Sequence, residues 1–214
     1  MIIRCIPGGS FLTNSYIVAD EDTKEGILID PGSQVDEVLE EIERLGLNIT
    51  KIVNTHAHID HAAGVEKAKR ELGAKFYLHP KEEPVLLALP ESALRFPEFG
   101  HVDVPEIDVY VEEGDSIEFG GYTAKVIHTP GHTYGSICLL VDESVFSGDT
   151  LFAGSVGRVD LTGGTSMREL IRSIKTKLMI LPSHYKVYPG HGPFTTIGTE
   201  RRSNPFIAGG IVLF

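Results

Sequence analysis

The stretch Thr55-His56-Ala57-His58-Ile59-Asp60-His61 is the most informative part of this chain, because it places four possible metal ligands in six consecutive positions. It follows a short apolar run, residues 51–54, in which Ile52 and Val53 indicate a buried strand. It precedes residues 62–72, whose apolar spacing indicates an amphipathic helix. The four polar side chains are therefore expected in the turn after a strand, which is where α/β folds form their binding sites.

The chemistry of these four side chains predicts a metal site. Imidazole nitrogens and a carboxylate suit zinc and also accept iron or manganese. Four donors so close in sequence cannot all face one ion with tetrahedral angles, because neighbouring side chains diverge from a bent turn. We therefore expect two ions, one bound by His56 and His58 and the other by Asp60 and His61. Burying these groups without a metal would leave polar atoms unpaired, at a cost on the order of several kcal/mol.

Three later stretches can supply the ligands that each ion still lacks. Two of them place a histidine beside glycine after proline, namely Thr129-Pro130-Gly131-His132-Thr133 and Tyr188-Pro189-Gly190-His191-Gly192. Such a turn lets the backbone approach a ligand closely. The third, Ser147-Gly148-Asp149-Thr150, ends an apolar run with an acid that could bridge two cations.

The segment from His56 to His61 matches the HxHxDH motif of the metallo-β-lactamase superfamily, and the later histidines and acid follow in that family's order. The resemblance extends over nearly the whole chain. It implies one α/β domain, residues 1–214, built as a four-layer αββα sandwich with two mixed β-sheets and the metals at one sheet edge. The ligand sets that it implies are His56, His58 and His132 for the first ion and Asp60, His61 and His191 for the second, with Asp149 bridging both.

Composition sets further bounds. With 214 residues, 42% of them hydrophobic, the chain can bury a sizeable core. Its formal net charge of -11 argues against a nucleic-acid partner, which a basic face would usually attract. The first five residues lack a signal-peptide pattern and no long apolar run follows, so we expect a soluble, cytoplasmic protein with no membrane partner. Cys5 and Cys138 lie in strand-like runs and are expected to be buried free thiols.

Periodicity and turn residues predict the remaining elements. Helices are expected over residues 62–72 and 81–95, and also where apolar residues recur at helical spacing from Val35 up to Gly46. A further helix, capped by residues 162–166, is expected to carry Leu170, Ile171, Ile174 and Leu178 on one face. A two-residue hairpin turn is expected at Asp142-Glu143. The predicted strands, besides the one that ends at Val53, are 2–6, 13–19, 26–30, 75–78, 109–111, 116–119, 123–129, 137–141, 144–147 and 186–188.

Two features near the expected site allow more than one interpretation. Asp30 either supports a ligand imidazole through a hydrogen bond or is a turn acid. Residues 96–105, rich in aromatic side chains and proline, either form an apolar wall over the site or cross the surface.

The metal ligands predict a hydrolase. Two cations that share a water molecule lower its pKa towards neutrality, so a metal-bridging hydroxide is the expected nucleophile. Asp60 is the predicted catalytic residue, because its carboxylate can orient the nucleophile or accept its proton. The chain has no Gly-x-Ser-x-Gly motif for serine-based hydrolysis. Neither cysteine lies in the metal motifs, and the bridging Asp149 differs from β-lactamases without such an acid, so antibiotic hydrolysis is not expected as the main activity.

Residues 154–160 and 190–206 resemble the short, single-domain branch of the glyoxalase II-like hydrolases. This resemblance implies hydrolysis of a small-molecule thioester, with hydroxyacylglutathione as the reference substrate. Full-length glyoxalase II has an additional helical domain for glutathione, and this chain stops at Phe214, so a smaller thioester or a lactone is an alternative substrate. Arg158 could contact an anionic group of the substrate, and Asp160 could pair with Arg158 or with a ligand histidine.

The alternative function is that of a glutathione persulfide dioxygenase. These enzymes look similar because they share the HxHxDH stretch and a Gly-Arg-x-Asp segment, and they bind one iron through residues that match His56, His132 and Asp149. Their last histidine lies in a Pro-Ala-His-Asp context, whereas this chain has Pro189-Gly190-His191-Gly192, which favours hydrolysis. A phosphodiesterase is less well supported, because the chain shows no basic track for nucleic acid.

Overall fold

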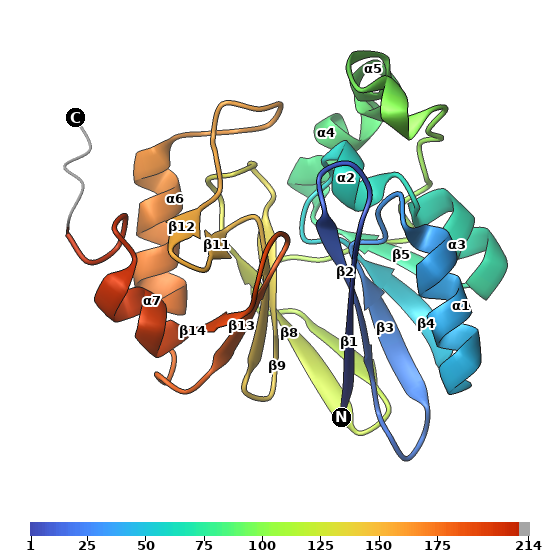
Figure 1. The fold of residues 1–214 in the computed structure, drawn as a ribbon, viewed down its shortest axis with the longest axis horizontal. Helices are drawn as coiled ribbons and strands as arrows, with labels where there is room; N and C mark the ends of the chain where they lie inside the picture. Colours follow the sequence, from blue (N-terminus) through green and yellow to red (C-terminus); the bar gives the residue numbers. More distant parts are fainter. Residues whose placement is uncertain (210–214) are drawn as a thin grey trace.

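Two six-stranded sheets face each other at the centre of the structure, a computed structural model that describes residues 1–209 (Figure 1). The first sheet has the order β1-β2-β3-β4-β5-β6, with β1 (Ile2–Gly8), β2 (Thr13–Ala19), β3 (Glu25–Ile29), β4 (Asn48–Val53), β5 (Lys75–Leu78) and β6 (Val109–Tyr110). The second has the order β14-β13-β10-β9-β8-β7, with β7 (Ser116–Phe119), β8 (Tyr122–His128), β9 (Ile137–Val141), β10 (Ser144–Gly148), β13 (Lys186–Pro189) and β14 (Thr195–Thr196).

Both sheets are mixed. In the first, β1, β2 and β3 pair antiparallel, whereas β3 to β6 are parallel. In the second, β10 and β13 are parallel and the other pairs are antiparallel. The predicted two-residue turn at Asp142-Glu143 joins β9 to β10, and Asp142 has the positive φ, 49°, that such a hairpin turn requires.

Helices cover the outer face of each sheet, which confirms the predicted αββα sandwich (Figure 1). On the side of the first sheet lie α1 (Val35–Leu45), α2 (Ile59–Ala62), α3 (Val65–Leu72), η1 (Pro80–Glu82), α4 (Glu83–Leu87), α5 (Leu89–Arg95) and η2 (Pro97–Phe99). On the side of the second lie α6 (Met167–Ser173), its continuation η3 (Ile174–Leu178) and α7 (Ile197–Ser203), near the small hairpin of β11 (Leu151–Phe152) and β12 (Ser155–Val156).

The alternation of side chains along the strands builds the core in three layers. In β2, Ile17 packs towards the helices of the first sheet, whereas Tyr16 and Val18 pack between the two sheets. Cys138 of β9 belongs to the third layer, against α6 and α7. Burying both faces of a sheet in this way requires apolar residues at successive positions, as β2 and β10 show.

The helix expected over residues 62–72 is divided, because α2 ends at Ala62 and α3 begins at Val65. Between them the backbone of Gly64 packs against the carbonyl oxygens of Pro31 and Gly32, where a side chain would overlap. The helix expected over residues 81–95 is likewise divided, into α4 and α5, each with a proline in its first turn.

Cys138 is buried as predicted, whereas the prediction for Cys5 was wrong. Cys5 is exposed because β1 is an edge strand that no outer layer covers completely. None of the helices within residues 1–209 combines the length and the apolar character that crossing a bilayer requires.

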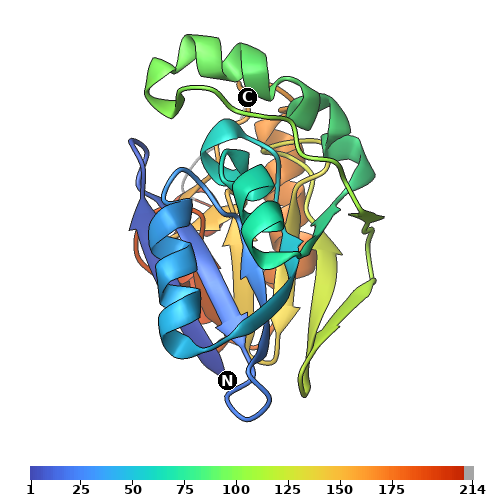
Figure 2. The same cartoon turned by 90° about the vertical axis from the view of Figure 1, so that its right-hand side faces the viewer.

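Figure 2 shows the segment that contains α4 and α5 lying across one end of the first sheet, above α2. This end of the sheet is where the strands β4 and β5 finish, and α2 follows β4 directly. The segment therefore covers the region in which the sequence places the first four candidate ligands.

Candidate metal centre

The seven predicted ligands come together from four loops, each of which follows a strand. The β4–α2 loop carries His56 and His58, and Asp60 and His61 lie at the start of α2. The loops after β8, β10 and β13 carry His132, Asp149 and His191. The two sheets meet at this end, where Thr13 and His191 form an isolated β-bridge.

Three imidazoles form the first group, namely His56, His58 and His132. His132 Nε2 lies 2.9 Å from His58 Nδ1 and 3.2 Å from His56 Nε2. The other nitrogens are occupied: His132 Nδ1 donates to the Arg158 carbonyl at 2.6 Å, and His58 Nε2 donates to the Thr162 carbonyl at 2.9 Å.

The tautomer of His56 follows from its neighbour. The Thr55 hydroxyl donates to Asp30 at 2.6 Å, so it can only accept from His56 Nδ1, 3.1 Å away. The three nitrogens that face one another, His56 Nε2, His58 Nδ1 and His132 Nε2, therefore carry no proton. Each directs a lone pair towards the same point. A divalent cation satisfies that arrangement, because neutral imidazole is a common metal ligand.

Asp60, His61 and His191 form the second group. Asp60 Oδ2 lies 3.4 Å from His61 Nε2 and 3.2 Å from His191 Nε2, and it also accepts from the Thr13 hydroxyl at 2.8 Å. His191 Nδ1 donates to the Phe11 carbonyl at 3.0 Å, which leaves Nε2 to face the carboxylate.

Asp149 contacts both groups. Its Oδ1 lies 3.4 Å from His61 Nε2, and its Oδ2 lies 3.6 Å from His132 Nε2 and 3.5 Å from His191 Nε2. Within residues 1–209, Asp149 Oδ1 and His61 Nε2 are buried atoms without a hydrogen-bond partner. Buried polar atoms are rarely left unpaired, so the donor set and these two atoms fit a divalent metal site.

The electrostatics of the two groups differ in the protein without metal. Burial, opposed in part by Asp149, lowers the pKa of His132 to about 4, so this imidazole is neutral. Burial would also lower the pKa of His191, but hydrogen bonds to Asp149 and Asp60 outweigh it and raise this pKa to about 9. Burial opposes the ionisation of Asp60, yet His61 and His191 hold its pKa at about 2. Asp60 and Asp149 thus favour positive charge in the second group, which the proton on His191 supplies without metal and a bound cation could supply in its place.

Asp30 forms a hydrogen bond with the ring of a candidate ligand, which is the first of the two interpretations that the sequence allowed. Its Oδ2 accepts from His61 Nδ1 at 3.0 Å, and its Oδ1 accepts from the backbone N–H of Thr55 at 2.7 Å. Asp30 adopts a φ of 50°, a left-handed conformation that aspartate tolerates better than most residues. The same residue therefore forms the turn and fixes the ring of His61.

Glu82 is a residue of the site that the sequence analysis did not single out. Its buried side chain accepts from the backbone N–H of Ala57 at 2.9 Å and from that of Gly135 at 2.8 Å. Ala57 lies between His56 and His58, and Gly135 follows in the loop that carries His132. No local sequence signal distinguishes this glutamate from the exposed Glu83 that follows it.

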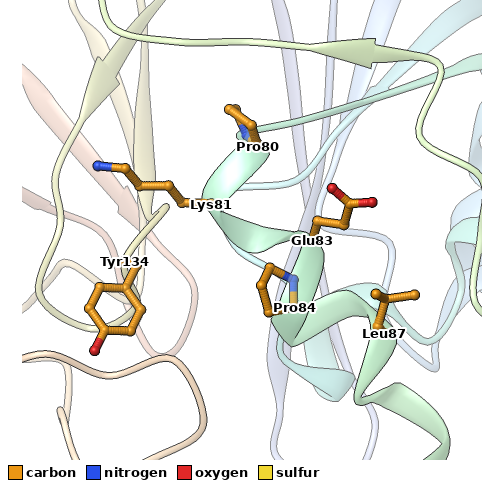
Figure 3. Close-up of a pocket in the computed structure, with 6 residues that line it drawn as sticks. All are labelled: Pro80, Lys81, Glu83, Pro84, Leu87 and Tyr134. Atoms are coloured by element: carbon orange, nitrogen blue, oxygen red, sulfur yellow. The ribbon is translucent and has the colours of Figure 1, made fainter.

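Figure 3 shows the η1–α4 segment close to Tyr134, which lies in the same loop as His132. Lys81 and Pro84 lie across a shallow groove from Tyr134, two residues after His132. The groove contains no candidate ligand. The η1–α4 segment therefore lies beside the loop that carries His132. Through Glu82 it also contacts the loop that carries His56 and His58.

A separate cavity of about 690 Å³ opens above the candidate ligands. Phe96 lines it and packs edge-on against Phe11 with ring centroids 5.3 Å apart, so this residue forms the apolar wall that the sequence analysis had considered. The lining residues other than the candidate ligands are Phe11, Ile59, Ser92, Arg95, Phe96, Phe152, Val156, Arg158, Asp160, Leu161 and Thr162.

Arg158 and Asp160 line the cavity as an ion pair. Arg158 Nε and Nη2 donate to the two oxygens of Asp160 at 2.7 and 2.8 Å. Asp160 therefore pairs with Arg158, and the group that fixes His132 is the backbone carbonyl of Arg158.

Comparison with known proteins identifies the family of the chain. A family model described as the metallo-beta-lactamase superfamily matches residues 8–191. The hydroxyacylglutathione hydrolase GloC of Haemophilus influenzae is 36% identical over 216 residues, which cover 97% of this chain and 98% of that protein.

Three solved structures resemble the whole chain. BLEG-1, a B3 metallo-beta-lactamase, is 35% identical with a TM-score of 0.89 and coverage of 97% of this chain and 100% of its own. TTHA1623 in a di-iron-bound form is 36% identical with a TM-score of 0.84, covering 95% and 99%. ETHE1 from Myxococcus xanthus is 31% identical with a TM-score of 0.82, covering 98% and 85%.

Proposed function

Because this chain belongs to the metallo-beta-lactamase superfamily, we propose that it is a metal-dependent hydrolase that cleaves a small-molecule thioester such as S-lactoylglutathione. The observation that carries the proposal is the position of Asp149, whose two oxygens contact both groups of histidines at the floor of one cavity. The likeness to the hydroxyacylglutathione hydrolase GloC supports a thioester as the substrate.

The proposed cofactor is a pair of divalent ions, with zinc as the first choice and iron or manganese as alternatives. The di-iron form of TTHA1623 supports the possibility of iron. When bound, the ions would lower the pKa of a water molecule and polarise the thioester carbonyl. The residues that would hold them are His56, His58 and His132 on one side and Asp60, His61 and His191 on the other, with Asp149 shared.

The protein's own residues supply orientation and a proton acceptor. Asp60 lines the cavity as an ionised carboxylate, and the Thr13 hydroxyl fixes its rotamer through a hydrogen bond of 2.8 Å. Asp60 can therefore orient the attacking water and accept its proton. Phe11, Phe96 and Phe152 give the same cavity apolar surface, which would keep bulk water away from a bound acyl group.

The second candidate function is that of a mononuclear iron dioxygenase acting on glutathione persulfide, and the likeness to ETHE1 supports it. Three ligands for one iron, His56, His132 and Asp149, lie together here. The hydrolase is favoured because Asp60, His61 and His191 also converge within ligand distance of one another. The likeness to BLEG-1 adds a β-lactam to the acyl compounds that need testing.

The test combines metal analysis with four compounds that a hydrolase could cleave and one substrate for a dioxygenase. The purified protein is assayed for metal content, then for initial rates on S-lactoylglutathione, a thioester without glutathione, a lactone and a β-lactam, and for oxygen uptake with glutathione persulfide. We expect about two ions per chain and thioester turnover without oxygen uptake. One iron per chain with oxygen uptake would establish the dioxygenase instead.

The variant Asp149→Asn tests the shared ligand. Replacing a carboxylate that contacts both groups should lower the bound metal from two ions to one or fewer and abolish thioester turnover. Asp36→Asn, at an exposed acid of α1, is the control that should keep both. Retention of two ions and full activity by the Asp149 variant would contradict the proposed bridging role.

A further inference from the structure

Three charged side chains other than the candidate ligands line the cavity: Arg95, Arg158 and Asp160. Two of them neutralise each other, because Arg158 directs two N–H groups at the two oxygens of Asp160. Arg158, which the sequence analysis proposed as an anion contact, is therefore already occupied. The remaining cation of the lining is Arg95, the last residue of α5.

Arg95 keeps most of its hydrogen-bonding capacity. Among residues 1–209 its one acidic partner is Glu91, which contacts Nη2 alone at 2.5 Å and does not line the cavity. A guanidinium has five N–H donors, so four remain for another group. The side chain is 65% exposed, so its guanidinium is in contact with solvent.

The surroundings of Arg95 suit one end of an elongated ligand. Ser92 lies one helical turn earlier on the same face of α5 and also lines the cavity. Phe96 follows Arg95 and forms the apolar wall together with Phe11. The lining thus combines candidate ligands, an aromatic wall and polar residues of α5. The segment with α5 lies across this end of the molecule in Figure 2.

We propose that Arg95, assisted by the hydroxyl of Ser92, binds a carboxylate of the substrate, so that the preferred thioester carries an anion remote from its carbonyl group. The inference rests on the proposed hydrolase function and names its substrate class. A chain with a formal charge of -11 repels anions at long range, and a cation on the cavity rim, remote from the proposed metal ions, would offset this repulsion at the far end of the ligand. The planar, forked guanidinium matches a carboxylate in geometry as well as charge.

The test compares two thioesters with the same lactoyl group. One is S-lactoylglutathione, whose thiol part carries two carboxylates, and the other is the lactoyl thioester of N-acetylcysteamine, which carries none. Arg95→Ala should raise KM for the first about five- to tenfold, as expected for one solvent-exposed charged hydrogen bond, and leave kcat and the second substrate unchanged. Arg95→Lys should recover part of the loss.

A matched control removes the same charge elsewhere. Arg168→Ala, at an exposed position of α6 outside the cavity lining, should leave both substrates unchanged. If Arg95→Ala affects both thioesters equally, or neither, the proposed anion site is wrong. Thermal unfolding of each variant shows whether a uniform loss comes from misfolding, and the lysine variant keeps the test valid in that case.

A binding measurement separates this inference from the proposed function. If the wild-type protein hydrolyses neither thioester, the function fails, but the anion site is still measurable by calorimetry with free glutathione and with its diethyl ester. The site predicts that glutathione binds more tightly than the ester, and that Arg95→Ala removes the difference. Equal binding of both by the wild-type protein would overturn the inference.

Discussion

The backbone N–H of Ala57 donates to the buried carboxylate of Glu82 at 2.9 Å, although 25 residues separate the two in the chain. The second oxygen of Glu82 accepts from Gly135 at 2.8 Å, three residues after His132. One carboxylate therefore fixes the distance between two loops that provide histidines to the same group. Its buried position excludes water as a substitute partner.

Glu82→Ala should lower both stability and metal affinity. The change leaves two buried N–H groups unsatisfied, which costs roughly 2–5 kcal/mol of unfolding free energy. The two loops then separate, so metal affinity should fall as well. Urea unfolding of the metal-free protein and chelator competition measure the two effects. Glu83→Ala, at the exposed neighbouring residue, should change neither by more than about 0.5 kcal/mol, and a similar loss in this control would contradict the explanation.

Asp30→Asn should weaken metal binding with little change in fold. Asparagine tolerates the positive φ at this position, but its amide cannot accept from both His61 and Thr55 as the carboxylate does. Loss of a hydrogen bond that orients a ligand imidazole typically costs about 10- to 100-fold in metal affinity. The measurement is competition with a chromophoric chelator. An unchanged affinity would show that the ring of His61 is fixed by packing alone.

Gly190→Ala should displace Asp149. A methyl group at Gly190 would overlap Asp149 Oδ1 and lie 2.7 Å from His61 Cε1. We expect a fall in metal stoichiometry and a loss of about 1–3 kcal/mol of stability from overpacking. Gly121→Ala is a control remote from the site, since its methyl group would approach Asp20 at 3.3 Å. Full metal content in the Gly190 variant would disprove the close contact.

His79 should make the metal-free protein sensitive to acid. Burial, together with the stacked ring of His128 and the charge of Lys81, lowers the pKa of His79 to about 4. The unfolded chain, with a pKa near 6.5, therefore binds more protons between pH 6.5 and 4, and stability falls as the pH drops through this window. Protonation also removes the Nδ1 acceptor that caps η1 through Lys81.

The variant His79→Asn isolates this effect, because its side-chain oxygen can still accept from Lys81 but does not titrate in this range. Its loss of stability between pH 6.5 and 4 should be smaller than that of the wild-type protein, measured by urea unfolding in the presence of a chelator. His101→Asn, at an exposed histidine, provides the control. Parallel pH profiles for wild type and His79→Asn would show that His79 does not contribute.

Local patterns allowed prediction of the strands and the ligand loops, whereas the layered arrangement was predicted from the resemblance of the ligand motifs to a known family. Strands such as β2 and β10 are marked by apolar runs, and the ligands follow them in short turns with proline and glycine. Cys5 was misjudged because an apolar run does not reveal whether a strand lies at the edge of its sheet. The break between α2 and α3 was also missed, since it depends on the packing of Gly64 against a distant loop.

The supporting residues of the site were harder to predict. Glu82 acts through backbone groups 25 and 53 residues away, and such distances leave no trace in a local pattern. The sequence left open whether Asp160 pairs with Arg158 or with a ligand histidine, and it did not indicate that Arg95 lines the same cavity. Partner choice among charged residues is a property of the folded surface.

Each group of candidate ligands combines side chains from loops that follow strands of the two different sheets. This arrangement has a consequence for folding kinetics. His56 and His132 are 76 residues apart, and the amide of Asn14 holds the His191 loop through Pro189, 175 residues away. Such contacts form late, because closing long loops costs entropy before the contacts are gained. A metal that binds only the completed groups should leave the refolding rate unchanged and slow the unfolding rate, so its benefit would be a longer lifetime of the native state.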